Sequence, residues 1–174
     1  MQHIAHLSKD KKLKKLLDTQ PPFLLKKRNK VYLRLCSSIL SQQLSTRVAQ
    51  VLYKRFLDLY GGKEPSPQQI LDTPAEVFRS IGFSNAKASY VHNVCRFFIE
   101  HKITDAALHK MSNDEVIELL TQIKGVGKWT VEMILMFTLA REDVFAFDDL
   151  GLNQGLIRLY DLKETDKTLL QKKM

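Results

Sequence analysis

Two glycines set one residue apart are the residues of this chain best placed to hold a reactive molecule. Gly125 and Gly127 lie in the segment Ile-Lys-Gly-Val-Gly-Lys-Trp-Thr, residues 123–130. Glycines at this spacing allow a tight turn whose backbone N–H groups point outward. The apolar stretch at 131–139 predicts a helix that begins at those amides. A helix N-terminus with free N–H groups is an anion site, so the segment predicts phosphate binding.

A pair of aspartates, Asp148 and Asp149, follows further along the chain. A carboxylate at a fixed distance from a phosphate-binding turn can act on the molecule that the turn holds. Both features also have a purely structural interpretation, because glycine serves ordinary helix–helix turns and aspartate commonly caps a helix. The residues alone do not decide which aspartate would do which task.

The elements around these residues are predicted to be helices. Helices are expected over residues 9–18, 29–42, 44–60, 66–72, 74–81, 84–101, 104–110, 113–123, 127–140, 149–160 and 165–172. Capping boxes mark three of the starts, at Ser66, Thr73 and Ser112. The helix from residue 44 is predicted to bury one apolar face, formed by Leu44, Val48, Val51, Leu52, Phe56 and Leu59. We find no alternating strand pattern, and residues 144–147 are predicted to be an extended connector.

Composition limits the class of protein. The chain has 174 residues, of which 44% are hydrophobic and 26% charged, which is typical of one globular domain or two small lobes. The net charge of +8 favours a polyanionic partner. Cys36 and Cys95 lie in apolar runs and are predicted to be buried free thiols in a reducing compartment. No stretch predicts a membrane span or a signal peptide, so we expect an intracellular protein.

Four segments together resemble the helix-hairpin-helix DNA glycosylase superfamily, in particular its 3-methyladenine DNA glycosylase II branch. The first is the hairpin followed by Asp-Asp-Leu-Gly-Leu at 148–152. The others are Ile-Leu-Ser-Gln-Gln-Leu-Ser at 39–45, Arg-Ser-Ile-Gly-Phe-Ser at 79–84 and Lys-Ala-Ser-Tyr at 87–90. The likeness runs from about residue 6 to residue 160. A glycine pair alone is weak evidence, but the four segments together are specific.

The resemblance implies an all-α fold of two lobes, with double-stranded DNA bound in the cleft between them. One glycosylase domain would span residues 1–174, with the hairpin at about 113–140, and would act as a monomer. The DNA phosphate would contact the hairpin at Gly125, Val126, Gly127, Lys128 and Thr130. A monovalent cation, Na⁺ or K⁺, would sit on the backbone carbonyls of Thr121, Ile123 and Val126. We expect no other cofactor, because the histidines and cysteines show no metal-ligand spacing and no Walker or Rossmann motif occurs.

By the same resemblance, Asp149 matches the catalytic carboxylate. Cleavage of an N-glycosidic bond builds positive charge on the sugar as the base departs. A fixed carboxylate stabilises that charge and can orient the attacking water. We therefore assign the helix cap to Asp148.

Trp129 occupies the position at which lyase-competent relatives carry a lysine nucleophile. Tryptophan cannot form an imine with the sugar, so the resemblance implies a monofunctional enzyme that leaves an abasic site. Two places for the ring remain open. It could line the base pocket with Met133, where an electron-rich ring attracts a cationic alkylated base, or both residues could belong to the core.

The segment Gln42, Gln43 and Leu44 matches the loop that fills the gap left by the flipped nucleotide. We favour Gln43 as the wedge. The alternative is that these residues simply end one helix and begin another. The turn at 82–87 is a further candidate, for contact with the opposite strand.

These features predict a monofunctional DNA glycosylase that flips an alkylated purine of the 3-methyladenine type and hydrolyses its glycosidic bond in base excision repair. The alternatives are a glycosylase for deaminated or oxidised bases, and a non-catalytic helix-hairpin-helix DNA-binding protein. Such an enzyme would work in the cytoplasm and nucleoid of a bacterium or in the nucleus of a eukaryote. Family members usually continue into a C-terminal closing helix that we do not find here, so we expect either a shortened chain or a lobe completed in another way.

Overall fold

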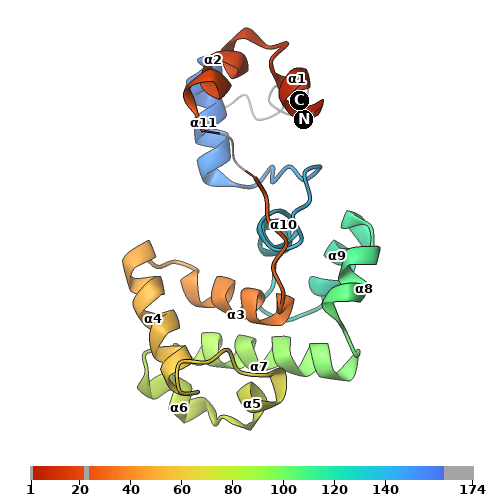
Figure 1. The fold of residues 1–174 in the computed structure, drawn as a ribbon. Helices are drawn as coiled ribbons and strands as arrows, with labels where there is room; N and C mark the ends of the chain where they lie inside the picture. The colour runs from red at the N-terminus through yellow and green to blue at the C-terminus, as the bar shows by residue number, and fades with distance from the viewer. Residues whose placement is uncertain (1, 22–23, 163–174) are drawn as a thin grey trace. The chain divides into compact units, whose positions relative to one another are not determined.

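The fold was obtained as a computed structural model, which describes residues 2–21 and 24–162. Every regular element in these ranges is a helix, which confirms the predicted all-α class (Figure 1). The chain divides into two compact units, one formed by residues 1–24 with 145–174 and the other by residues 25–144. None of the helices in the described ranges is long and apolar enough to cross a membrane.

The larger unit contains eight of the helices in the described ranges. They are α3 (Val31–Ser41), α4 (Thr46–Asp58), α5 (Pro67–Asp72), α6 (Ala75–Ser80), α7 (Asn85–Glu100), α8 (Asp105–Lys110), α9 (Asn113–Leu120) and α10 (Lys128–Phe137). The smaller unit contains α1 (Gln2–Leu7), α2 (Lys11–Thr19) and α11 (Leu150–Tyr160). The sequence predicted all of these except α1. The helix predicted at 165–172 lies outside the described residues.

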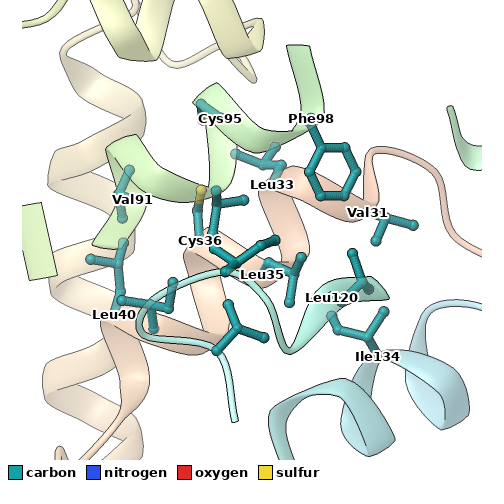
Figure 2. Close-up of a cluster of buried hydrophobic side chains, with 14 of the residues drawn as sticks. Val31, Leu33, Leu35, Cys36, Leu40, Val91, Cys95, Phe98, Leu120 and Ile134 are labelled. Atoms are coloured by element: carbon teal, nitrogen blue, oxygen red, sulfur yellow. The ribbon is translucent and has the colours of Figure 1, made fainter. Parts of the chain in front are cut away.

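The core of the larger unit is built around α3. Six of its eleven residues are buried, and α4, α7 and α10 all pack against it. Figure 2 shows Val31, Leu33 and Cys36 of α3 among side chains of α7, with Leu120 and Ile134 in the same cluster. A helix buried on this scale provides a rigid base for the loops at its two ends.

Two of the three predicted capping boxes are present. Ser66 and Ser112 form the predicted capping boxes of α5 and α9. The capping box predicted at Thr73 is wrong. Pro74 occupies the N-cap of α6, and the Thr73 hydroxyl instead donates to the carbonyl of Gln69, 2.8 Å away. Because α5 ends at Asp72, Thr73 is the C-cap of that helix and serves its end.

The apolar face predicted for α4 is only half buried. Leu52 and Phe56 reach the core, where Phe56 packs against the rings of Phe78 and Phe83. Toward the start of the helix, Val48 and Val51 are exposed, at 50% and 47%. The helical spacing was therefore right, but the first two turns of α4 have no core beneath them within this unit.

Candidate active site and nucleic-acid interface

The glycine hairpin joins α9 to α10 as predicted. Its turn is closed by a hydrogen bond from the Val126 N–H to the Ile123 carbonyl, 2.9 Å long. Asn93 of α7 donates from Nδ2 to the carbonyl of Lys124 at 3.2 Å and so attaches the turn to the core helix. The hairpin is thus part of the rigid framework of its unit.

The two glycines serve different purposes. Gly125 has φ +103°, and a Cβ there would lie 2.3 Å from the Tyr90 ring, so the turn cannot form with a larger residue. Gly127 is the N-cap of α10 with φ −94°, and a Cβ there would meet no atom of the protein within 4 Å. The protein's own packing therefore requires glycine at 125 but gives no reason for it at 127.

The first turn of α10 has the properties of an anion site. Its N-cap offers no side chain to the free N–H groups, and no acidic residue lies in the first turn. By contrast, α9 is capped by Ser112 and carries Asp114 and Glu115 in its first turn. The positive end of the α10 dipole is therefore left open to an external anion. Because α10 is longer than two turns and aligned peptide dipoles add, this end carries a substantial partial charge.

The two side chains predicted to assist at this turn differ in exposure. Lys128 is well exposed, and its ammonium lies 3.9 Å from the Glu132 carboxylate one turn along. Thr130 is only 3% exposed, which places it in the interior. Its hydroxyl is therefore poorly placed for the predicted side-chain contact.

Trp129 lies at the surface of the larger unit. It is 39% exposed, so the interpretation as a buried core aromatic is wrong. The ring lines a cavity of about 400 Å³ together with Ser38, Ser41, Gln42 and Gln43. The structure therefore brings Trp129 beside the predicted wedge loop, although the two are more than eighty residues apart in sequence. Met133 is half-buried and does not line this cavity, so the predicted shared wall is not formed there.

Asp149 belongs to the smaller unit and is the N-cap of α11. Its Oδ1 accepts a hydrogen bond from the Leu152 N–H at 2.7 Å, and its own N–H donates to the Ala146 carbonyl at 3.0 Å. The assignment of the cap to Asp148 is therefore wrong, because Asp149 has the extended backbone next to the first helical residue. The bond fixes the direction of the Asp149 carboxylate, so the cap and a chemical role are compatible.

Comparison with known proteins places this geometry in a family. Residues 36–174 match the model of the HhH-GPD superfamily base excision DNA repair protein. The chain belongs to this superfamily. Because the match covers most of the chain, including the hairpin and Asp149, the resemblance inferred from four short segments is confirmed.

Individual members of the superfamily agree. The chain is 36% identical to DNA-3-methyladenine glycosylase 1 of Schizosaccharomyces pombe, over 92% of this chain and 72% of that protein. It is 35% identical to the DNA-3-methyladenine glycosylase of Saccharomyces cerevisiae, over 91% of this chain and 55% of that protein. The solved structure of the S. pombe 3-methyladenine DNA glycosylase in complex with abasic DNA superposes with a TM-score of 0.85 at 34% identity, covering 99% of this chain and 87% of that one. The chain thus spans about half to seven tenths of the length of these two curated relatives.

The sequence did not reveal the contacts that three residues of α7 make at the site, namely Lys87, Tyr90 and the Asn93 already described. Lys87 and Tyr90 lie one turn apart near the start of α7; Lys87 contacts the wedge loop and Tyr90 supports Gly125. Both fall in the segment Lys-Ala-Ser-Tyr that contributed to the resemblance, but no contact could be derived for them. One signal in the sequence could have indicated a contact for Lys87. This lysine falls in the first turn of a predicted helix, at the end where the dipole disfavours a cation.

Proposed function

We propose that this protein is a monofunctional DNA-3-methyladenine glycosylase of base excision repair. It flips an alkylated purine out of duplex DNA and hydrolyses the bond between that base and its deoxyribose. The proposal is supported by superfamily membership and by relatives named as DNA-3-methyladenine glycosylases. The observation that carries the chemistry is the Asp149 carboxylate, whose direction is set by its bond to Leu152.

DNA is held first through its backbone. The open N-terminus of α10 accepts one phosphate, and Lys128 adds positive charge beside it. A monovalent cation on the carbonyls of Thr121, Ile123 and Val126 would add a further charge to the hairpin. The Ile123 carbonyl already accepts the Val126 N–H, and its second lone pair remains available to a cation.

The proposed reaction requires few catalytic groups. A purine alkylated on a ring nitrogen is cationic and leaves as a neutral base, so no strong general acid is required. As the bond lengthens, positive charge grows on the sugar, and the carboxylate of Asp149 stabilises it and orients water toward the anomeric carbon. The base leaves neutral with the electron pair of the broken bond, water gives its hydroxyl to the anomeric carbon, and the remaining proton of that water passes to solvent, which leaves free base and an abasic site.

The pocket beside the wedge loop suits such a base. Trp129 lines the cavity, where a cationic purine would gain both stacking and attraction to the ring face. The side chains of Ser38, Ser41 and Gln42 supply hydrogen-bonding groups around it. A neutral oxidised or deaminated base would lack the cation–π contribution, which is why we favour the alkylated class.

The deciding experiment is a base-release screen. The protein is incubated with duplexes carrying 3-methyladenine, 7-methylguanine, hypoxanthine, uracil or 8-oxoguanine, and free bases are identified by mass spectrometry. We expect release of the methylated purines. Release of hypoxanthine or 8-oxoguanine alone would support the glycosylase for another lesion, and binding without any release would support the non-catalytic DNA-binding protein.

The product strand is expected to remain intact. Trp129 stands where a lyase would need lysine, so no imine forms with the sugar. Borohydride added during the reaction should therefore trap no protein–DNA adduct. An adduct that persists after replacement of Lys128 and blocking of the N-terminal amine would contradict this prediction.

Binding to undamaged duplex is expected to be sequence-tolerant and steeply salt-dependent. The reasons are the net charge of +8 and a hairpin that addresses phosphate instead of base edges. Each phosphate neutralised contributes roughly −0.9 to the slope of log K against log salt concentration. Titrations of several unrelated duplexes between low and moderate salt measure this slope. An affinity that does not change with salt concentration would show that phosphate contacts do not drive binding.

A further inference from the structure

The loop that carries the predicted wedge is short and sharply bent. Ser41 ends α3 and Ser45 caps α4, so residues 42–44 make the whole connection. Gln43 has φ +59°, a left-handed backbone that residues other than glycine rarely adopt. A loop of this kind keeps one shape only when its surroundings impose it.

The side chain of Lys87, which lies outside the loop, holds the loop in this shape. Its ammonium donates to the carbonyl of Leu40 at 2.8 Å and to the carbonyl of Gln42 at 3.0 Å. One group thus joins the last turn of α3 to the residue before the bend. Its backbone N–H in turn donates to the Ser84 hydroxyl that caps α7, at 3.2 Å. The loop is therefore attached to α7, which packs along α3 through the core.

This placement is not explained by the stability of α7 itself. Lys87 lies in the first turn of the helix, where the dipole disfavours a positive charge. It is also partly buried, and the loss of water around it lowers the pKa of its ammonium. Both costs are offset at the C-terminal end of α3, where the exposed carbonyls and the negative end of the dipole receive a cation.

The bonds of Lys87 act on the residues that line the cavity with Trp129. Gln42 and Gln43 both line it, and Lys87 holds the Gln42 carbonyl directly. The sequence suggested a different task, contact of the turn at 82–87 with the opposite DNA strand. The structure directs Lys87 inward to the loop instead.

We infer that Lys87 is a positioning residue that presets the loop at 42–44 in the shape that enters the duplex. The inference rests on the proposed function, because it assumes that this loop fills the space of the flipped nucleotide. Lys87 does not touch the base. It acts by sparing the protein the cost of ordering the loop when DNA binds, so its loss should weaken insertion without removing the catalytic group.

The test measures insertion without requiring base release. A duplex carries a stable abasic-site analogue, with 2-aminopurine opposite it, and fluorescence rises when a side chain enters the stack. Lys87→Met keeps the length of the side chain but removes the ammonium and both of its hydrogen bonds. It should need at least about tenfold more protein for a half-maximal rise, because the loss of even one charge-assisted hydrogen bond has an effect of that size. Lys87→Arg, which can still donate to both carbonyls, should recover most of the signal.

The control is Lys63→Met, which removes an equal charge from an exposed position in the loop before α5. Equal behaviour of the Lys87→Met and Lys63→Met proteins would overturn the inference, as would failure of Lys87→Arg to recover the signal. If Lys87→Met does not fold, Lys87→Gln takes its place under the same criteria. No rise with the unmodified protein would also overturn it, because no side chain would then enter the duplex.

A parallel measurement separates this inference from the proposed function. Single-turnover base release is followed from an alkylated base in a fully paired duplex and in a duplex where that base faces a mismatch and is already partly unstacked. The Lys87→Met defect should shrink on the mismatched duplex, whereas a general loss of folded protein would lower both rates equally. Absence of base release by the unmodified protein would refute the proposed function, while the fluorescence test would still decide the role of Lys87.

Discussion

Replacing Asp149 by asparagine is expected to abolish base release and leave DNA affinity intact or higher. Removal of one preorganised charge from a reaction of this type costs about 10²–10³ in rate or more. The amide oxygen of asparagine can still accept the Leu152 N–H that Asp149 Oδ1 now accepts, so α11 keeps its cap and the fold should survive. The measurement is single-turnover release of a methylated purine, together with duplex affinity and thermal unfolding.

Asp148→Asn is the matched control, because it removes the same charge from the neighbouring residue. Asp148 is exposed and does not cap the helix. It should release base at close to the normal rate. If Asp149→Asn retains activity and Asp148→Asn loses it, the assignment of the catalytic carboxylate is wrong.

Substitution of the two hairpin glycines should have different effects: Gly125→Ala should lower stability, and Gly127→Ala should lower DNA affinity. In Gly125→Ala, the new Cβ must occupy a backbone with φ +103° and would lie 2.3 Å from Tyr90. Backbone strain and overpacking each cost about 1–3 kcal/mol, so the protein should lose roughly 3 kcal/mol and unfold about 10 °C lower. In Gly127→Ala, the Cβ meets nothing in the protein, so stability should change by no more than about 1 kcal/mol, the difference between glycine and alanine at an N-cap.

DNA affinity, unlike stability, should depend on Gly127. Gly127→Ala should bind all duplexes more weakly, because its Cβ stands where a phosphate approaches the amides of α10. Gly127→Ser checks that the lost cap is not the cause, since serine is a good N-cap but also carries a Cβ. A folded Gly127→Ala protein with normal affinity would leave the hairpin as a structural turn. Calorimetry and salt-matched titrations measure the two properties separately.

Features that depend on a few neighbouring residues were predictable from sequence. The hairpin, the capping boxes at Ser66 and Ser112, and the boundaries of most helices follow from local patterns and were confirmed. The errors arose where local patterns compete. Thr73 lies between two short helices and serves the end of the first. Asp149, and not Asp148, caps α11, because the cap is the residue with extended backbone just before the first turn.

The surroundings of the candidate site could not be predicted, because they depend on contacts between distant residues. Whether Trp129 is buried or lines a cavity depends on where α3 ends beside it. The bonds from Lys87 to Leu40 and Gln42 span more than forty residues and leave no periodic signal. Exposure of Val48 and Val51 likewise depends on how far the core extends under α4, which helical spacing does not reveal.

The chain's two cysteines, Cys36 of α3 and Cys95 of α7, are both fully buried in the core of the larger unit. Burial raises the pKa of the Cys36 thiol well above its usual range, and a hydrogen bond with Cys95 adds to this effect. Only the ionised form of a thiol reacts readily with electrophiles. Methylating compounds also attack accessible thiolates, and here packed side chains cover both sulfur atoms. If the proposed function is right, the protein meets such compounds together with its substrate, and burial shields these two side chains from them.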